Sequence, residues 1–355
     1  MVESRPIGIS TVAYVLGMNS GKLQRWYRNV LSGYLEASES GKLFENDIED
    51  KDYYIPVPIL KPDNMGSHMA IDEKYIDGEY YTILSNKETG KIAMLAQTTK
   101  SSHIAEILST CGDKCMNVKT ISRDLAPHYD MVCRENFMNA IAVADKFHII
   151  KIVLQAVQDQ RIEYRHLVKA YENKLYEEHQ EREKRNQIKA RLQGKKYKKE
   201  KYTYRAQKYA NGETKLQILQ RSRGLLFKPK TKWHTSMKIR AEILFELFPE
   251  LEKLYNLSET FRRWMSKSNI GKSRTLMGKR IKNWFGEIDH LDNFYMNQVK
   301  ITINKHLGVI MNYFYEGTTN AFAENLNRHI KRFIASLFGI REMDFFFFRL
   351  AIYFS

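Results

Sequence analysis

The sequence contains little cysteine and no pattern that would make cysteine structural. Three cysteines occur in 355 residues, at Cys111, Cys115 and Cys133. An odd number this small excludes a disulfide framework. Cys111 and Cys115 form a C-x3-C pair, but no second pair follows to complete a tetrahedral zinc site. We therefore expect buried, free thiols.

Long apolar runs are also missing. No stretch of 18 or more apolar residues occurs, and Asn19, Lys22 and Arg25 interrupt the apolar residues near the N-terminus, where a signal peptide would need continuity. We expect a soluble, cytoplasmic protein with no membrane partner. The length is sufficient for a sizeable core and for more than one domain.

The positive charge is concentrated in one part of the chain. The formal net charge is +16, and residues 161–240 hold 24 of the 57 Lys and Arg but only 8 of the 41 Asp and Glu, leaving 33 of each sign elsewhere. Within this part, tyrosines alternate with cations in KARLQGKKYKKEKYTYRAQKY. Cations neutralise phosphates and rings stack on bases, so the pattern predicts a nucleic-acid surface. The alternative is a solvated charge run without a partner. The candidate contacts are Lys195, Lys196, Lys198, Lys199, Lys201 and Arg205.

The N-terminal segment, residues 1–50, contains a helix-turn-helix candidate. Residues 7–30 predict two short helices around a turn at Gly17, with Ser10 capping the first helix. The expected apolar cluster consists of Val12, Val15, Leu16, Leu23 and Trp26. The side chains then free to contact DNA are Ser20, Lys22, Gln24, Arg25 and Arg28. Many helical hairpins bind nothing, so a purely structural hairpin remains open.

Residues 67–150 predict a mixed sheet. The runs SHMAIDEKYI, EYYTILSN and KIAMLAQ are typical of antiparallel strands, and a helix, the strand VKTIS, a second helix and the strand AIAVA follow. Strands that alternate with helices favour parallel pairing. We expect an α/β fold with a five-stranded sheet and flanking helices. Residues 51–66 contain IPVPILKP, whose prolines indicate a linker.

The rest of the chain predicts helices. Residues 151–315 have helical apolar spacing, apart from residues 181–215, which have no apolar face and are expected to be partly disordered without a partner. Residues 316–355 begin with an amphipathic helix, TTNAFAENLNRHIKR. Its polar stripe consists of Asn320, Glu324, Asn327 or Arg328, and Lys331, while Phe322, Leu326, Ile330 and Phe333 face the other side. Arg328 and Lys331 are further candidate DNA contacts.

Three acids stand where a catalytic site would need them. Asp72 lies on the first predicted strand of the sheet, Asp124 ends the fourth, and Glu324 lies on the late amphipathic helix. If the two strands pair and the helix covers the sheet, their carboxylates can hold two divalent ions against a phosphodiester, and magnesium or manganese suits such ligands. Taken singly, each acid also fits a structural role: a strand-end hydrogen bond, an N-cap or an exposed helix charge.

Several motifs together resemble a known family. In order they are AIDEKY, VKTISRD, NAIAVADKFHIIK, QAVQDQR, RGLLFK and TNAFAENLNRHIKR, over roughly residues 65–350. They resemble the DDE transposases of the ISL-three group of bacterial insertion sequences. The resemblance implies a ribonuclease-H-like catalytic domain interrupted by a helical insertion, with Asp72 and Glu324 as first and third acids. Asp124 is favoured as the second acid over Asp145, which then forms an auxiliary pair with His148.

The resemblance also implies an activity. The implied activity is metal-dependent cleavage and strand transfer of DNA with two Mg²⁺ or Mn²⁺ ions. Its substrates are the double-stranded ends of the element and the target DNA. The resemblance implies that a homo-oligomer associated with the nucleoid performs the reaction. Members often carry an N-terminal zinc ribbon, which has no counterpart here, so a separate end-recognition polypeptide is one interpretation. Two alternatives stay open: an inactive or repurposed DNA-binding protein, and a ribonuclease-H-like nuclease.

Overall fold

The computed structural model describes residues 7–43, 45–316, 321–336 and 342–354, without the side chains of residues 316, 321–327 and 336. The chain divides into two units. Unit 1 comprises Met1–Ile149, Ile270–Arg274 and His306–Ser355, and unit 2 comprises Ile150–Asn269 and Thr275–Lys305. Among the described helices, none is both long enough and apolar enough to cross a membrane.

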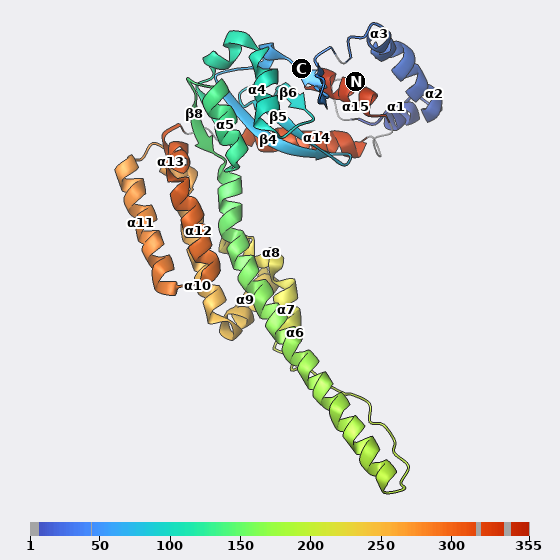
Figure 1. Cartoon of the computed structure of the whole chain (residues 1–355), viewed down its shortest axis with the longest axis vertical. Helices are drawn as coiled ribbons and strands as arrows, with labels where there is room; N and C mark the ends of the chain where they lie inside the picture. Colours follow the sequence, from blue (N-terminus) through green and yellow to red (C-terminus); the bar gives the residue numbers. More distant parts are fainter. Residues whose placement is uncertain (1–6, 44, 317–320, 337–341, 355) are drawn as a thin grey trace. The chain divides into compact units, whose positions relative to one another are not determined.

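Unit 1 is built on a six-stranded mixed sheet in the order β3-β6-β5-β4-β7-β8. Figure 1 labels four of its strands, β4, β5, β6 and β8. The strands are β3 (Ile59–Leu60), β4 (His68–Ile76), β5 (Glu79–Asn86), β6 (Ile92–Ala96), β7 (Thr120–Arg123) and β8 (Ile141–Ala144). Strands β3, β6, β5 and β4 pair antiparallel, whereas β4, β7 and β8 run parallel. The predicted antiparallel pairing of the first strands and parallel pairing of the later ones is therefore confirmed.

The predicted strand count was one too low. Strand β3 is only two residues long and lies at the sheet edge, within the proline-rich segment that we predicted to be a linker. Prolines are tolerated at edge strands because their missing N–H groups face outward. Residues Ile55, Val57 and Ile59 of this segment are buried, so it is packed against the sheet.

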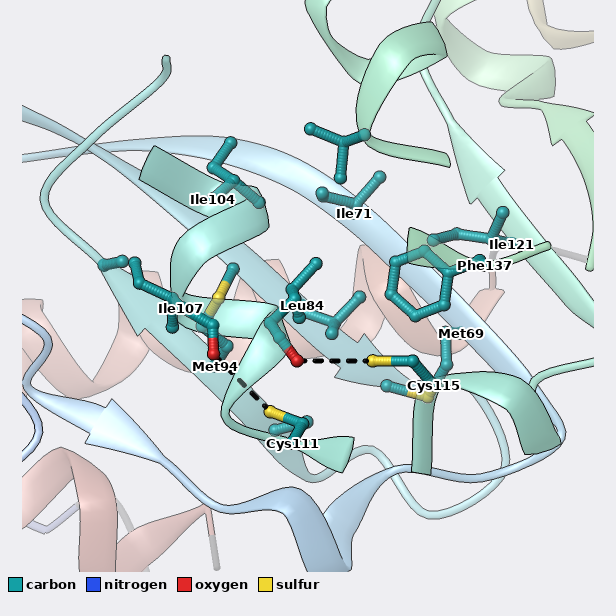
Figure 2. Close-up of a cluster of buried hydrophobic side chains, with 14 of the residues drawn as sticks. Met69, Ile71, Leu84, Met94, Ile104, Ile107, Cys111, Cys115, Ile121 and Phe137 are labelled. Carbon is teal, nitrogen blue, oxygen red and sulfur yellow. Dashed lines mark hydrogen bonds between the residues drawn. The ribbon is translucent and has the colours of Figure 1, made fainter. Parts of the chain in front are cut away.

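One face of the sheet is covered by α4 (Ser101–Ser109) and α5 (Pro127–Asn136). Met69, Ile71 and Leu84 of the sheet belong there to one buried cluster with apolar side chains of both helices. Figure 2 shows them near Ile104 and Ile107 of α4. All three cysteines are buried and free, as predicted. The Cys115 thiol, in the 3₁₀ helix Gly112–Asn117, donates to the carbonyl of Leu108 over 3.8 Å, which ties this turn to α4.

The opposite face is covered by the C-terminal helices α14 (Ala321–Ser336) and α15 (Met343–Tyr353). Ile330 and Phe333 of α14 are buried against Ile83 of β5, which confirms their predicted anchoring role. The side chains of Phe322 and Leu326 lie outside the described residues. Helix α13 (Leu307–Glu316) lies against β8, where the Asn312 amide donates to the carbonyl of Ala142 over 2.8 Å.

The N-terminal part of unit 1 has short elements. They are α1 (Ile9–Val15), α2 (Ser20–Trp26), a π-helical turn (Tyr27–Leu31), α3 (Tyr34–Glu39), and strands β1 (Ile48–Glu49) and β2 (Tyr54–Ile55), followed by a 3₁₀ turn (Pro62–Asn64). The two predicted helices and the turn at Gly17, with a φ of 64°, are present. The predicted cap is wrong, because Gly8 precedes α1 and no side chain caps it.

The apolar cluster of this hairpin also differs from the prediction. Val15, Leu16 and Trp26 are exposed, whereas Ala13 and Tyr27 are buried. The physical reason is a long-range partner: Phe345 of α15 belongs to the same cluster, so the buried positions depend on the C-terminal helix as well as on the packing of α1 against α2. Helical periodicity within residues 7–30 contains no information about that partner.

Unit 2 is helical, as predicted. Its elements are most of α6 (Lys146–Leu192), α7 (Lys215–Arg221), α8 (Arg223–Leu226), α9 (Thr235–Leu247), α10 (Pro249–Trp264), most of α11 (Arg274–Leu291) and α12 (Phe294–Lys305), with 3₁₀ turns at Lys230–Lys232 and Lys267–Asn269.

The far end of α6 is stabilised by the segment that follows it. Helix α6 extends through residues 181–192, although the sequence has no apolar face there. Residues 195–207 have no regular secondary structure, and the ring of Tyr202 packs on that of His179, with centroids 5.1 Å apart. The backbone N–H of Glu200 also donates to the Glu183 carboxylate over 2.8 Å. Residues 195–207 of the chain itself therefore provide some of the contacts that we expected from an external partner.

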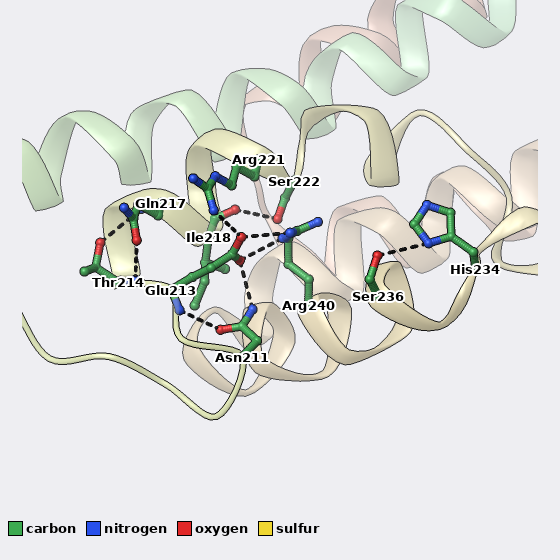
Figure 3. Close-up of polar contacts among 10 residues, drawn as sticks. All are labelled: Asn211, Glu213, Thr214, Gln217, Ile218, Arg221, Ser222, His234, Ser236 and Arg240. Atoms are coloured by element: carbon green, nitrogen blue, oxygen red, sulfur yellow. Dashed lines mark hydrogen bonds and ion pairs between the residues drawn. The ribbon is translucent and has the colours of Figure 1, made fainter.

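A buried carboxylate ties three elements of unit 2 together (Figure 3). Glu213 accepts hydrogen bonds from Arg221 of α7, from Arg240 of α9 and from Asn211 in the preceding turn. Thr214 and Gln217 form a capping box that starts α7 directly after it. Glu213 thereby fixes the end of the basic segment, defined as residues 195–209, to the helices of unit 2.

Candidate active site

The strand register places three aspartates in one row. Ala70 of β4 pairs with Ser122 of β7, and Ser122 pairs with Val143 of β8. Side chains alternate along a strand, so Asp72, two positions further on within β4, lies on the same face as Ala70. The corresponding residues of the neighbouring strands are Asp124 and Asp145, which directly follow the last residues of β7 and β8. The backbone hydrogen bonding between β7 and β8 continues to Asp145, because the N–H of Asp145 donates to the carbonyl of Arg123 over 2.7 Å.

The row lies on the face that α14 covers. Asp72 pairs with Ile83 across the β4–β5 hairpin, and Ile83 packs in the same buried cluster as Ile330 and Phe333 of α14. Helix α14 includes Glu324, whose side chain lies outside the described residues, as does the whole of Asn320. The Arg328 and Lys331 side chains on this helix are exposed.

Asp72 is paired with a cation. Its Oδ2 atom lies 2.6 Å from Nζ of Lys74, two residues along the same strand, and its Oδ1 atom accepts from the backbone N–H of Glu73 over 2.9 Å. The Asp72 side chain keeps 26% of its exposure. The carboxylate is therefore accessible and already attracts a positive charge.

Asp124 and Asp145 each combine a place in the row with a backbone contact. The Oδ1 atom of Asp124 accepts from the N–H of Ala126 over 2.8 Å, immediately before α5 begins. The Oδ1 atom of Asp145 accepts in the same way from the N–H of Phe147, in the first turn of α6, over 2.8 Å. These turns orient both carboxylates through Oδ1, so a structural role and a catalytic role are compatible at each position.

His148 is a point where the charges of all three aspartates converge. Its Nδ1 atom lies 3.2 Å from Oδ2 of Asp145. The Asp145 carboxylate raises the pKa of His148 above its ordinary value, burial opposes the shift, and the charges of Asp72 and Asp124 contribute in the same upward direction. Carboxylates on β4 and directly after β7 and β8 therefore act on one side chain.

Lys87 is a buried cation that sequence reasoning missed. It belongs to the turn NKETG, yet its side chain is only 5% exposed. Its Nζ atom has no hydrogen-bond partner among the described residues. Burial lowers the pKa of Lys87 to about 8, an effect that the charge of Asp145 opposes. No pattern in the sequence signals this burial, because lysine in a turn is normally solvated.

No group of three His, Cys, Asp or Glu side chains within the described part of the chain has the geometry of a metal site. The side chain of Glu324 lies outside the described residues. The candidate site therefore consists of a row of three aspartates, an adjacent histidine and a covering helix that carries Glu324.

The predicted DNA contacts fall into two groups. In unit 2, Lys195, Lys196, Lys198, Lys199, Lys201 and Arg205 are all exposed, as a phosphate-binding surface requires. In unit 1, Arg25 is exposed. Arg28 was predicted to be free for DNA, but its guanidinium pairs with Glu342 and lies 4.8 Å from the centre of the Tyr34 ring. This pairing holds the π-helical turn to the segment before α15 and explains why spacing alone misjudged Arg28.

The chain was compared with protein families, curated proteins and solved structures. A family model described as "Transposase", for the DDE type of the ISL-three group, matches residues 69–350. This range contains the aspartate row, the basic segment and α14. No curated protein and no solved structure matches the chain.

Proposed function

The chain belongs to the DDE transposases of the ISL-three group, and from this premise we propose that it cleaves the ends of an insertion sequence and joins them to target DNA through Asp72, Asp124 and Glu324. The observation that supports this most is the aspartate row, because β4 and β7 bring two acids from distant parts of the sequence to one level of the sheet. The helix that carries the third acid covers the same face.

The donor chemistry fits divalent cations. Carboxylate oxygens are the ligands that Mg²⁺ and Mn²⁺ prefer, and a cation bound at Asp72 would take the place of the Lys74 ammonium, which lies 2.6 Å from this carboxylate. Asp72, Asp124 and Glu324 would hold the ions. Bound there, two ions would activate a water or a 3′-hydroxyl for attack on a phosphodiester and stabilise the departing oxygen.

The chain's other residues position the reactants. Asp145 lies 3.2 Å from Nδ1 of His148 at the start of α6, next to the row, where the imidazole can donate to a phosphate oxygen of the scissile strand. The exposed lysines of residues 195–201 neutralise phosphates further along the DNA. Both ends of an element must be held together, so we propose that the chain acts as a homo-oligomer on DNA. The helices α1 and α2, or a separate polypeptide, would recognise the ends.

The test compares two aspartates of one hairpin. Asp72→Asn removes a proposed ligand, whereas the control Asp77→Asn makes the same charge change at an exposed turn position with a φ of 48°, which asparagine accepts. Each purified protein is incubated with Mg²⁺ and labelled DNA from the flanks of the coding region. We expect Asp72→Asn to lower strand transfer by about 100- to 1,000-fold, the value of several kcal/mol of lost charge stabilisation, and to leave DNA binding in place.

The products also separate the alternatives. Joined strands support a transposase, whereas cleaved but never joined strands indicate a nuclease. Binding without any product indicates a DNA-binding protein that has lost catalysis. Strand transfer by Asp72→Asn at the rate of the wild type would contradict the assignment. A parallel comparison of Asp124→Asn and Asp145→Asn decides the second acid: we expect the larger loss at Asp124.

A further inference from the structure

Unit 2 contains a cavity of about 450 Å³ that the proposed chemistry does not use. It lies between α6, the end of the returning basic segment and the residue before α10. Its lining consists of Tyr164, Leu167, Val168, Tyr171, Glu172, Tyr204, Ala206, Gln207, Tyr209, Lys215 and Phe248. The volume is within the usual range for small-ligand pockets.

Aromatic rings form the walls of this cavity, and other contacts fix several of them. Tyr164 stacks on Phe248, with ring centroids 4.8 Å apart and an angle of 27° between the rings. The Tyr164 hydroxyl donates to Glu250 over 2.6 Å, which holds the ring in place. On the other side, Tyr204 stacks on Tyr202 at an angle of 14°. These rings need not reorganise to receive a flat ligand.

Two of the lining rings remain exposed. The side chain of Tyr171 is 61% exposed and that of Tyr204 is 42% exposed, and Leu167 beside them is 60% exposed. Single exposed apolar side chains are ordinary, but three that line one cavity form a binding surface. Tyr171 comes from α6 and Tyr204 from the segment that folds back along it, so both of these parts of the chain contribute to the cavity wall.

The charges around the cavity favour a nucleic acid over an apolar peptide. Arg205 and Lys208 are exposed neighbours of the lining residues in the sequence. Lys215, itself in the lining, has its Nζ atom 5.1 Å from the centre of the Phe248 ring. Single-strand binding sites have two components: cations that follow the nucleic-acid backbone, and aromatic rings that stack on the bases. Gln207 and Glu172 add polar atoms for the edge of a base.

We propose that this cavity holds an unstacked base of single-stranded DNA, with the phosphates on either side neutralised by Arg205 and Lys208. The inference rests on the proposed function, because strand cleavage and joining leave nucleotides at the reacting ends without a pairing partner. Stacking on an aromatic side chain is available to every base, so the site reads the absence of pairing rather than the sequence.

The first test measures binding of fluorescent oligothymidylate to the full chain without divalent metal, so that it does not depend on catalysis. We expect Tyr171→Leu and Tyr204→Leu each to weaken binding by roughly 5- to 150-fold, the fold-change of one stacked base, while Tyr171→Phe, which keeps the ring, binds like the wild type. The control Phe294→Leu removes an exposed ring of unit 2 that does not line the cavity, and should change nothing.

The second test locates the base directly. An oligonucleotide with one 5-iodouracil is irradiated in complex with the protein, and the cross-linked peptide is identified by mass spectrometry. A cross-link to Tyr171 or Tyr204 supports the proposal. Cross-links only elsewhere, or equal losses of single-strand and duplex binding in both leucine variants, would overturn it. The competing occupant of the cavity is an apolar peptide. Failure of such a peptide to displace oligothymidylate supports the proposal, whereas displacement by a peptide that binds more tightly contradicts it.

The two proposals can fail separately. Strand transfer that depends on Asp72, with no cross-link to the cavity, leaves the proposed function intact and removes this inference. Cross-linking at Tyr171, with no dependence of product formation on Asp72, leaves a single-strand site in a protein whose chemistry was misassigned.

Discussion

Glu213→Gln should destabilise unit 2 by an amount that the structure allows us to calculate. The Glu213 side chain is 6% exposed. Arg240 donates to both of its oxygens over 2.8 Å, and Arg221 donates to Oε1 over 2.9 Å. The hydrogen bonds from Arg240, followed by those from Arg221, lower the pKa of Glu213 from 4.5 to about 2, against the opposing effect of burial.

This pKa shift corresponds to a stability that depends on pH. Two and a half pKa units at 1.36 kcal/mol each give about 3 kcal/mol. The folded pKa lies below the unfolded one, so the contribution is complete above pH 4.5 and is lost as pH falls towards 2. The neutral amide of the substituted side chain cannot accept from two guanidinium groups equally well, so we expect a loss of about 3 kcal/mol at pH 7. For a unit of this size that lowers the melting temperature by about 6–12 °C.

Differential scanning calorimetry from pH 7 down to pH 3 measures the effect on the transition of unit 2. The matched control is Glu246→Gln, which neutralises an exposed glutamate on α9 and should leave the transition within about 0.5 kcal/mol of the wild type. The wild type and Glu213→Gln should converge as pH falls. A difference that stays constant with pH, or no difference at pH 7, would refute the reasoning.

Two further predictions concern lysines. Replacing Lys195, Lys196, Lys198, Lys199 and Lys201 by glutamine should weaken duplex binding and reduce the slope of log affinity against log salt by about 0.9 for each phosphate that is no longer neutralised; an unchanged slope in binding titrations would show that these lysines are merely solvated. Lys87→Met should raise the melting temperature at pH 7 by relieving a buried ammonium with a pKa of about 8, and wild-type stability should rise as pH increases from 8 to 10.5; a lower melting temperature would reveal an essential partner for Lys87.

The sheet was predictable from the sequence because its information is local. Short runs of apolar, β-branched and aromatic residues marked β4, β5 and β6, and the helical spacing between β7 and β8 implied their parallel pairing. Strand β3 was not predictable, since a two-residue strand has no period and becomes a strand only through its partner β6.

The candidate site was predictable in part, because the strands that carry two of its acids were predictable. Asp72 and Asp124 were expected at neighbouring strand positions, and the register of β4 and β7 places them level. The register of β8 also places Asp145 in the row, so position alone does not choose between Asp124 and Asp145. The pairing of Asp72 with Lys74, the burial of Lys87 and the pairing of Arg28 with Glu342 depend on side-chain directions and long-range packing, which no motif encodes.

The central claim is that the row holds catalytic metal ions, and a change of ligand tests it most directly. Asp72→Cys replaces a hard oxygen by a thiolate, which binds Mg²⁺ poorly and Mn²⁺ better. We predict that this variant loses strand transfer in Mg²⁺ and regains a measurable part of it in Mn²⁺, while Asp77→Cys behaves like the wild type in both. Equal activity of Asp72→Cys and the wild type in Mg²⁺ would contradict the account.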